Sequence, residues 1–203
     1  MLEPHGGWQR AGPGTAPHPR ASITLPFLAL MLSFVRPAGA AGQIDLHVDR
    51  DTDLLRVRAT VAAAAPAELC YSVIADFDHL ADFIPGLVSS RIVSEPGKPL
   101  ELRQVGETTL GLSRYTIDVT LALMTDPPRR INFTRVAGNL LVMQGSWQVE
   151  GDGDGCRIDY RTDMQPEFWV PPLIGALLVR HQVALQLHGL KAEIDRRAAI
   201  QLP

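Results

Sequence analysis

Cysteine is scarce in this chain, and several catalytic signatures are missing altogether. The 203 residues contain two cysteines, and the sequence has no Gly-x-Ser-x-Gly, no His-Glu-x-x-His and no phosphate-binding glycine loop. These absences argue against a hydrolase nucleophile elbow, a zinc-protease helix and a nucleotide site. Asp152-Gly153-Asp154-Gly155 resembles part of a calcium loop, but no glutamate closes it, which favours a hairpin turn. We therefore predict no metal and no cofactor.

Charged residues are also few, and the basic ones do not cluster. They make up 20% of the chain, with a net charge of -3. The charge becomes -5 when the first 40 residues are set aside, because that segment holds Arg10, Arg20 and Arg36 against Glu3. A mildly acidic domain without a cluster of Lys or Arg lacks the positive surface that binding to a nucleic acid backbone requires. We therefore exclude nucleic acid as a partner.

The first 40 residues have the composition of a secretory signal. An apolar run over 21–35 is followed by Ala38-Gly39-Ala40, an A-x-A cleavage site. A membrane-spanning anchor is the alternative, but the run is short and contains Pro26. We predict a signal segment at 1–40, a single domain at 41–203, and export to the periplasm.

The two cysteines leave two alternatives open. An exported pair could form a disulfide, but Cys70 lies in the apolar stripe of a predicted helix and Cys156 lies at the start of a predicted strand. The sequence favours two small buried residues that are not bonded to each other.

The order of predicted elements indicates an α+β fold. Apolar residues at helical spacing follow Pro66, and Pro85-Gly86 ends a second short helix. Short turns separate the strands that follow, which favours antiparallel neighbours. The predicted strands are Ile44–Val48, Leu54–Ala62, Val88–Glu95, Leu100–Leu110, Arg114–Met124, Arg130–Val136, Leu140–Glu150 and Cys156–Met164. A long helix from Pro171 to about Ala199 closes the chain, and we expect the sheet to curve around it and leave a hollow between them.

Alternation along the strands defines an inner face. Three apolar rows begin at Tyr115, Leu141 and Cys156, each opposed by polar residues. On the long helix, Leu173, Leu177, His181, Ala184, Leu185 and His188 are predicted to face inward, whereas Gln182, Gln186, Gly189 and Glu193 are predicted to form a polar back. Three small residues, Gly145, Thr162 and Ala184, are expected to leave room for a ligand.

These faces supply a candidate ligand-binding set. Its members are Tyr115, Phe133, Met143, Trp147, Tyr160, Leu177, His181, Ala184 and His188. The two histidines are seven positions apart, about 10 Å along a helix, which is too far for one metal ion. Either could instead bind a ligand carbonyl or hydroxyl, or bond to a strand. The aromatic residues could equally be plain core.

Two apolar segments are candidates for the rim of the hollow. Phe83 and Ile84 precede Pro85-Gly86 and could form a lid, or a packed corner. Trp169, next to Phe168, could touch a membrane transiently during ligand exchange, or could simply staple the start of the last helix.

The block 65–87, the strands 141–149 and 155–160, and Phe168-Trp169-Val170-Pro171-Pro172 together resemble the START-like helix-grip superfamily, also called SRPBCC. The chain is most similar to its polyketide cyclase/dehydrase and coenzyme Q-binding group over residues 54–197. The resemblance implies an antiparallel sheet around a C-terminal helix, with a cavity for a hydrophobic ligand. It implies no fixed catalytic set.

We therefore predict a periplasmic binding or carrier protein for a lipid, a quinone or a polycyclic aromatic. One alternative is a cyclase or dehydratase that uses His181 or a buried acid for proton transfer. Another is a domain that binds a protein of the cell envelope; the sequence does not identify such a protein partner.

Overall fold

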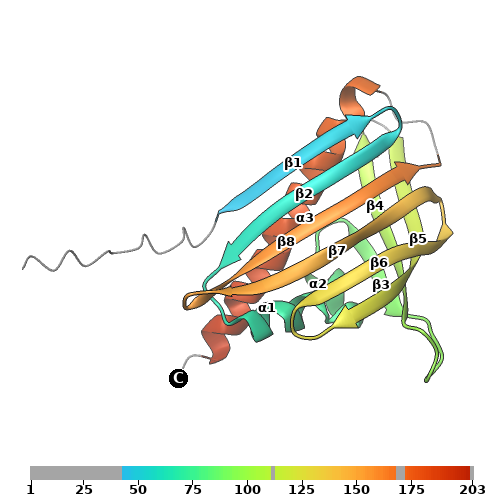
Figure 1. Ribbon diagram of the computed structural model, residues 1–203. Coiled ribbons are helices and arrows are strands. Elements are labelled where there is room, and N and C mark those ends of the chain that lie inside the picture. Colours follow the sequence, from blue (N-terminus) through green and yellow to red (C-terminus); the bar gives the residue numbers. More distant parts are fainter. Residues whose placement is uncertain (1–42, 111–112, 168–171, 202–203) are drawn as a thin grey trace, which may run out of the picture. The chain divides into compact units, whose positions relative to one another are not determined.

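The computed structural model describes residues 43–110, 113–167 and 172–201, and Figure 1 shows their arrangement. These residues form one sheet, a long C-terminal helix and three short helical segments. The strands are β1 (Ile44–Asp51), β2 (Leu54–Ala63), β3 (Leu87–Ile92), β4 (Glu101–Leu110), β5 (Ser113–Asp126), β6 (Arg130–Gly138), β7 (Leu140–Asp152) and β8 (Gly155–Pro166). The helices are α1 (Ala67–Ile74), the 3-10 segment η1 (Phe77–His79), α2 (Leu80–Phe83) and α3 (Pro172–Gln201). The predicted signal segment, 1–40, lies outside the described residues.

All eight strands are antiparallel, in the order β1-β2-β8-β7-β6-β5-β4-β3. Strands β3 to β8 follow one another as hairpins because their links are short, while β2 pairs with the last strand, β8. The sheet curves but does not close, so β1 and β3 are its edges. The predicted α+β helix-grip fold is confirmed.

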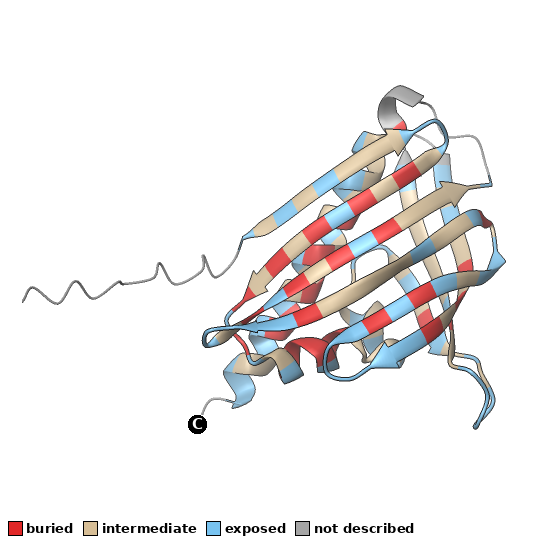
Figure 2. Cartoon of the chain, viewed as in Figure 1, coloured by how far each residue is buried: buried red, intermediate tan, exposed pale blue. Residues whose placement is uncertain are grey.

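Helix α3 runs along the concave side of the sheet and contacts β1, β2 and α1 (Figure 1). Its apolar row points into the core, where Val183 is 6%, Leu187 1% and Ile194 0% exposed. The buried positions alternate along β2 and β8, as Figure 2 shows, because every second side chain faces the helix.

The two cysteines form a disulfide, which corrects the prediction that they stay apart. Cys70 in α1 and Cys156 in β8 are 86 residues apart in sequence, but their Cα atoms are 6.7 Å apart. Both are buried, as predicted. The bond ties α1 to the end of the sheet.

Strand alternation is confirmed with one exception. In β5, Tyr115, Ile117 and Val119 face the helix as predicted. In β7, however, a register shift between Leu140 and Val142 turns Leu140 inward and leaves Leu141 51% exposed. The prediction for Leu141 is wrong because an extra residue in the strand reverses the alternation there.

The predicted inward face of α3 is wrong. Leu177 is 66% and Leu185 is 40% exposed, whereas the predicted polar back, which includes Gln182 and Gln186, faces the sheet. The helix carries apolar residues on both sides, so their spacing does not by itself select the buried one. Packing against β1, β2 and α1 selects the row that contains Val183 and Leu187.

Candidate functional site

A cavity of about 290 Å³ lies between α3 and the concave side of β3 to β8. The short segments α1, η1 and α2 contribute Ile74, Phe77 and Leu80 to its wall. Aliphatic and aromatic side chains dominate the lining, most of them from β5 and α3. On β5 they are the inward positions of a strand with a polar outer face. A concave apolar space of this size is typical of a small-molecule site.

Five predicted ligand-binding residues line this cavity: Tyr115, Phe133, Met143, Trp147 and Tyr160. Three of them form an aromatic group across neighbouring strands. The ring centroids of Trp147 and Tyr160 are 4.1 Å apart, and those of Phe133 and Tyr160 are 6.3 Å apart. The inward direction of these side chains is confirmed, and their role in binding a ligand stays a prediction.

Four predicted ligand-binding residues, all on α3, do not line the cavity. Leu177, His181 and His188 are exposed and Ala184 is half-buried, because all four lie on the side of α3 away from the lining. Placing them in the cavity was wrong, and the reason is the reversed helix face described above.

The two predicted rim segments have different outcomes. Ile84 lines the cavity, but Phe83 does not; its ring lies 5.7 Å from the guanidinium of Arg197. Trp169 lies outside the described residues.

Hydrogen bonds hold the corner around Ile84 against α3. The Gln182 Nε2 donates to the Pro85 carbonyl at 3.1 Å, and the Glu107 amide donates to the Gly86 carbonyl at 2.8 Å. Gly86 has φ +81, and a Cβ there would collide with the Gln182 amide. A Cβ at Gly189 of α3 would likewise approach the Phe83 carbonyl to 2.4 Å. The corner is therefore packed closely on the helix, with two glycines allowing the approach.

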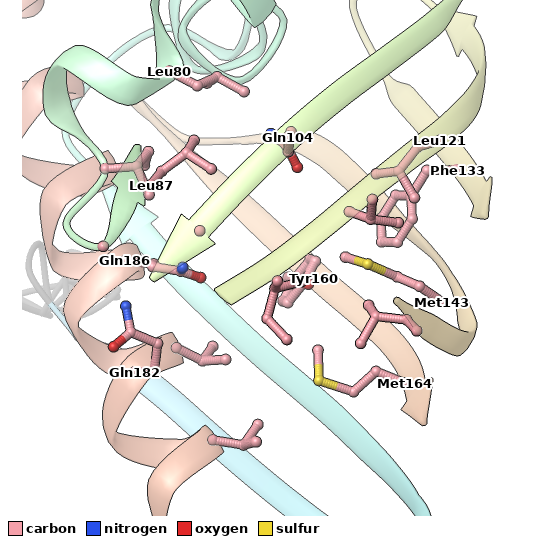
Figure 3. A pocket seen from close by; sticks show the side chains of 18 of the residues that line it. Leu80, Leu87, Gln104, Leu121, Phe133, Met143, Tyr160, Met164, Gln182 and Gln186 are labelled. Carbon is pink, nitrogen blue, oxygen red and sulfur yellow. The ribbon is translucent and has the colours of Figure 1, made fainter. Parts of the chain in front are cut away.

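The sequence reasoning missed three glutamines at the cavity. Gln104 on β4 and Gln182 and Gln186 on α3 line it, and Figure 3 shows the Gln186 amide extending from α3 toward the cavity. Phe133, Met143 and Met164 lie on the opposite side of the same view. The sequence contained one signal for the two helical glutamines: Gln182 and Gln186 are next to the apolar residues Val183 and Leu187. Because glutamine is polar, we instead predicted that both face solvent.

The cavity wall is electrically almost neutral. Among the described residues that line it, the ionisable ones are Glu107, Tyr115 and Tyr160. Burial raises the pKa of Tyr160 to about 12, although a hydrogen bond with Thr162 acts in the opposite direction. Tyr160 is therefore a neutral phenol at physiological pH.

A cluster of paired charged side chains lies in the C-terminal part of α3, away from the cavity lining. Hydrogen bonds from Arg196 lower the pKa of Glu193 to about 2; burial opposes this shift, and bonds from Arg197 add to it. Arg197 also pairs with Asp76 at 2.7 Å, which joins α3 to the segment after α1. We interpret this cluster as a structural contact that holds α3 against the segment after α1.

The small residues do not create the cavity, contrary to expectation. Gly145, Thr162 and Ala184 are absent from its lining. A Cβ at Gly145 would meet the Arg161 carbonyl at 2.1 Å, so this glycine permits close strand approach. The space arises where α3, which packs most extensively on β1, stands away from β5 to β7.

Within residues 43–110, 113–167 and 172–201, no three His, Cys, Asp or Glu side chains gather closely enough to hold a metal ion. No helix in this part of the chain has both the length and the apolar character required to cross a membrane.

An open antiparallel sheet that grips a long C-terminal helix over an apolar cavity defines the START-like helix-grip class. Residues 63–191 match the family model described as polyketide cyclase / dehydrase and lipid transport. The chain belongs to this family.

Solved structures share the fold. The aromatase/cyclase Zhui from Streptomyces sp. R1128 is 21% identical with a TM-score of 0.57, over 71% of this chain and 95% of that one. A STAR-related lipid transfer protein from Xanthomonas axonopodis is 15% identical with a TM-score of 0.60, over 74% and 93%. A protein from Thermus thermophilus is 20% identical with a TM-score of 0.58, over 70% and 99%. A search among curated proteins finds no match.

Proposed function

We propose that this protein binds and carries a hydrophobic small molecule in the cavity between the sheet and α3. The observation that carries the proposal is the cavity itself: about 290 Å³, with a mostly apolar wall that contains few charged groups. Burial of apolar ligand surface there contributes about 25 cal/mol per Å² removed from water. The family description, which includes lipid transport, supports this function, and a lipid, a quinone such as coenzyme Q or a polycyclic aromatic remain the candidate ligand classes.

We further propose that the protein works in the periplasm after export. The support is the signal-like composition of residues 1–40 together with the disulfide between Cys70 and Cys156. Disulfides persist in oxidising compartments and are rare in reducing ones. Fractionation of the host cell, with detection of the chain in the periplasmic fraction and its N-terminus after residue 40, tests this part.

The cyclase or dehydratase alternative loses the residue on which it most depended. His181 is exposed and does not line the cavity. A phenol with a pKa of about 12, as at Tyr160, is a poor proton acceptor near neutral pH. Carriage is therefore the function that the arrangement supports best.

Filling the cavity tests the proposal. Val179 lines it from α3, whereas Leu185 lies on the exposed side of the same helix. We expect Val179→Trp to abolish binding of an environment-sensitive apolar dye, because the indole occupies the ligand volume, and the matched control Leu185→Trp to bind as the wild type does. Mass spectrometry of protein isolated from its host would identify the ligand that co-purifies. Unchanged dye binding by a folded Val179→Trp would disprove the site.

A further inference from the structure

The amide of Gln186 is an uncommitted polar group of the cavity. Its side chain extends from α3 into the cavity (Figure 3), and within the part of the chain that the structure describes it has no hydrogen-bond partner. The other two glutamines are engaged: Gln104 donates to Ser90 Oγ at 3.3 Å, and Gln182 donates to the Pro85 carbonyl and accepts from Thr108. Gln186 therefore offers a free donor and a free acceptor.

An amide in apolar surroundings favours a ligand that can pair with it. Val183 and Leu187 flank Gln186 on α3, and Leu87 lines the same cavity. A polar group that loses water without gaining a partner costs roughly 1–3 kcal/mol. A ligand that carries a carbonyl or hydroxyl at this point avoids the cost, whereas a pure hydrocarbon does not.

The same wall disfavours a charged ligand. No Lys, Arg, His or Asp is among the described residues that line the cavity. The carboxylate of Glu107 lies 3.6 Å from Arg114, in a side chain that is 40% exposed. A ligand carboxylate would be buried without an opposite charge, which costs several kcal/mol, and a ligand ammonium would find only Glu107, which is already paired with Arg114.

Cavity volume limits the size of the buried part. Because an apolar cavity of about 150 Å³ binds benzene, a space of about 290 Å³ suits a group of about two fused rings.

We infer that Gln186 is a specificity-determining residue, and that the ligand is an uncharged hydrophobic molecule of about two fused rings with a carbonyl or hydroxyl that hydrogen-bonds to the Gln186 amide. This inference rests on the proposed function, because it assumes that the cavity takes an apolar ligand.

Three probes of similar size test the inference by isothermal titration calorimetry on the full domain. They are naphthalene, 2-acetylnaphthalene, which adds a neutral carbonyl, and 2-naphthoate, which places a charge there. We expect the ketone to bind about 3- to 10-fold tighter than naphthalene, and 2-naphthoate to bind at least about 10-fold weaker than the ketone.

The variant Gln186→Leu should reduce the ketone's advantage over naphthalene to about 1-fold while naphthalene binding is kept, because only the hydrogen bond is lost. Gln186→Met provides the same test with an unbranched side chain if the leucine variant fails to fold. Gln144→Leu is the matched control, since Gln144 lies exposed on β7 and is absent from the cavity lining. It should leave all three affinities unchanged.

Equal binding of 2-acetylnaphthalene and 2-naphthoate by the wild type would overturn the inference. So would a ketone preference that survives in Gln186→Leu and Gln186→Met. In both cases naphthalene binding would leave the proposed function standing. If naphthalene and the ketone both fail to bind, the cavity takes no apolar ligand of this size, and the proposed function fails together with the inference.

Discussion

Opening the Cys70–Cys156 disulfide should lower the free energy of unfolding by several kcal/mol. The bond joins residues 86 positions apart, and the chain-entropy relation for a loop of that length gives about 4.6 kcal/mol at 25 °C. Measured losses are commonly smaller, so we expect about 2–4 kcal/mol. This is a large share of the roughly 5–15 kcal/mol that stabilises a typical domain.

Urea denaturation followed by tryptophan fluorescence measures the effect in three samples. These are the oxidised wild type, the wild type held reduced, and the double variant Cys70→Ala/Cys156→Ala. The reduced wild type keeps every side-chain heavy atom, so its loss of stability reports the cross-link alone. The double variant also loses buried sulfur atoms, and it should be destabilised somewhat further because small cavities form.

A thiol count on the denatured protein provides the decisive control. Protein from an oxidising compartment should show no free thiol, and the same protein after reduction should show two, from Cys70 and Cys156. Two free thiols before reduction, or a stability that reduction changes by less than about 0.5 kcal/mol, would refute the reasoning.

Two further predictions concern contacts of α3. Gln182→Leu removes the hydrogen bond to the Pro85 carbonyl and should destabilise the domain by about 1–2 kcal/mol; hydrogen exchange at the Leu87 and Glu107 amides should accelerate, and unchanged rates would contradict this. The low pKa of Glu193, about 2 against an ordinary 4.5, predicts stability that is complete above about pH 5 and is lost as the pH falls toward 2. Because Arg196 is 60% exposed and water screens the pair, we expect about 1–2 kcal/mol, measured by urea titration at pH 6 and pH 3. In Glu193→Gln this part of the pH dependence should disappear. If both proteins lose the same amount of stability between pH 6 and pH 3, groups other than Glu193 cause the loss.

The antiparallel neighbours from β3 to β8 could be predicted because short links join successive strands. Most inward positions could be predicted because apolar and polar side chains alternate along each strand, and only one face is apolar. Tyr115 and Tyr160 lie where alternation places them. The failure at Leu141 has a local cause, the register shift beside it, which a regular period cannot contain.

The face of α3 could not be predicted because two sides of the helix carry leucine. Leu177 and Leu185 compete with Val183 and Leu187, and the choice depends on contacts with β1, β2 and α1, which are far away in sequence. The disulfide escaped prediction for a related reason. Its two cysteines come within bonding reach only once α1 is placed on the end of the sheet.

A domain that keeps this cavity open gives up stability, and a ligand should restore part of it. Unfilled apolar volume costs about 24 cal/mol per Å³, so 290 Å³ corresponds to at most about 7 kcal/mol before relaxation and water reduce the figure. A cost of that order is hard to reconcile with a purely structural role, since larger side chains could fill the space. Binding should therefore couple to folding: 2-acetylnaphthalene at 100 times its dissociation constant should stabilise the domain by about 2.7 kcal/mol. Thermal unfolding measures this as a rise in Tm that Val179→Trp should not show, and an equal rise in that variant would place the ligand outside the cavity.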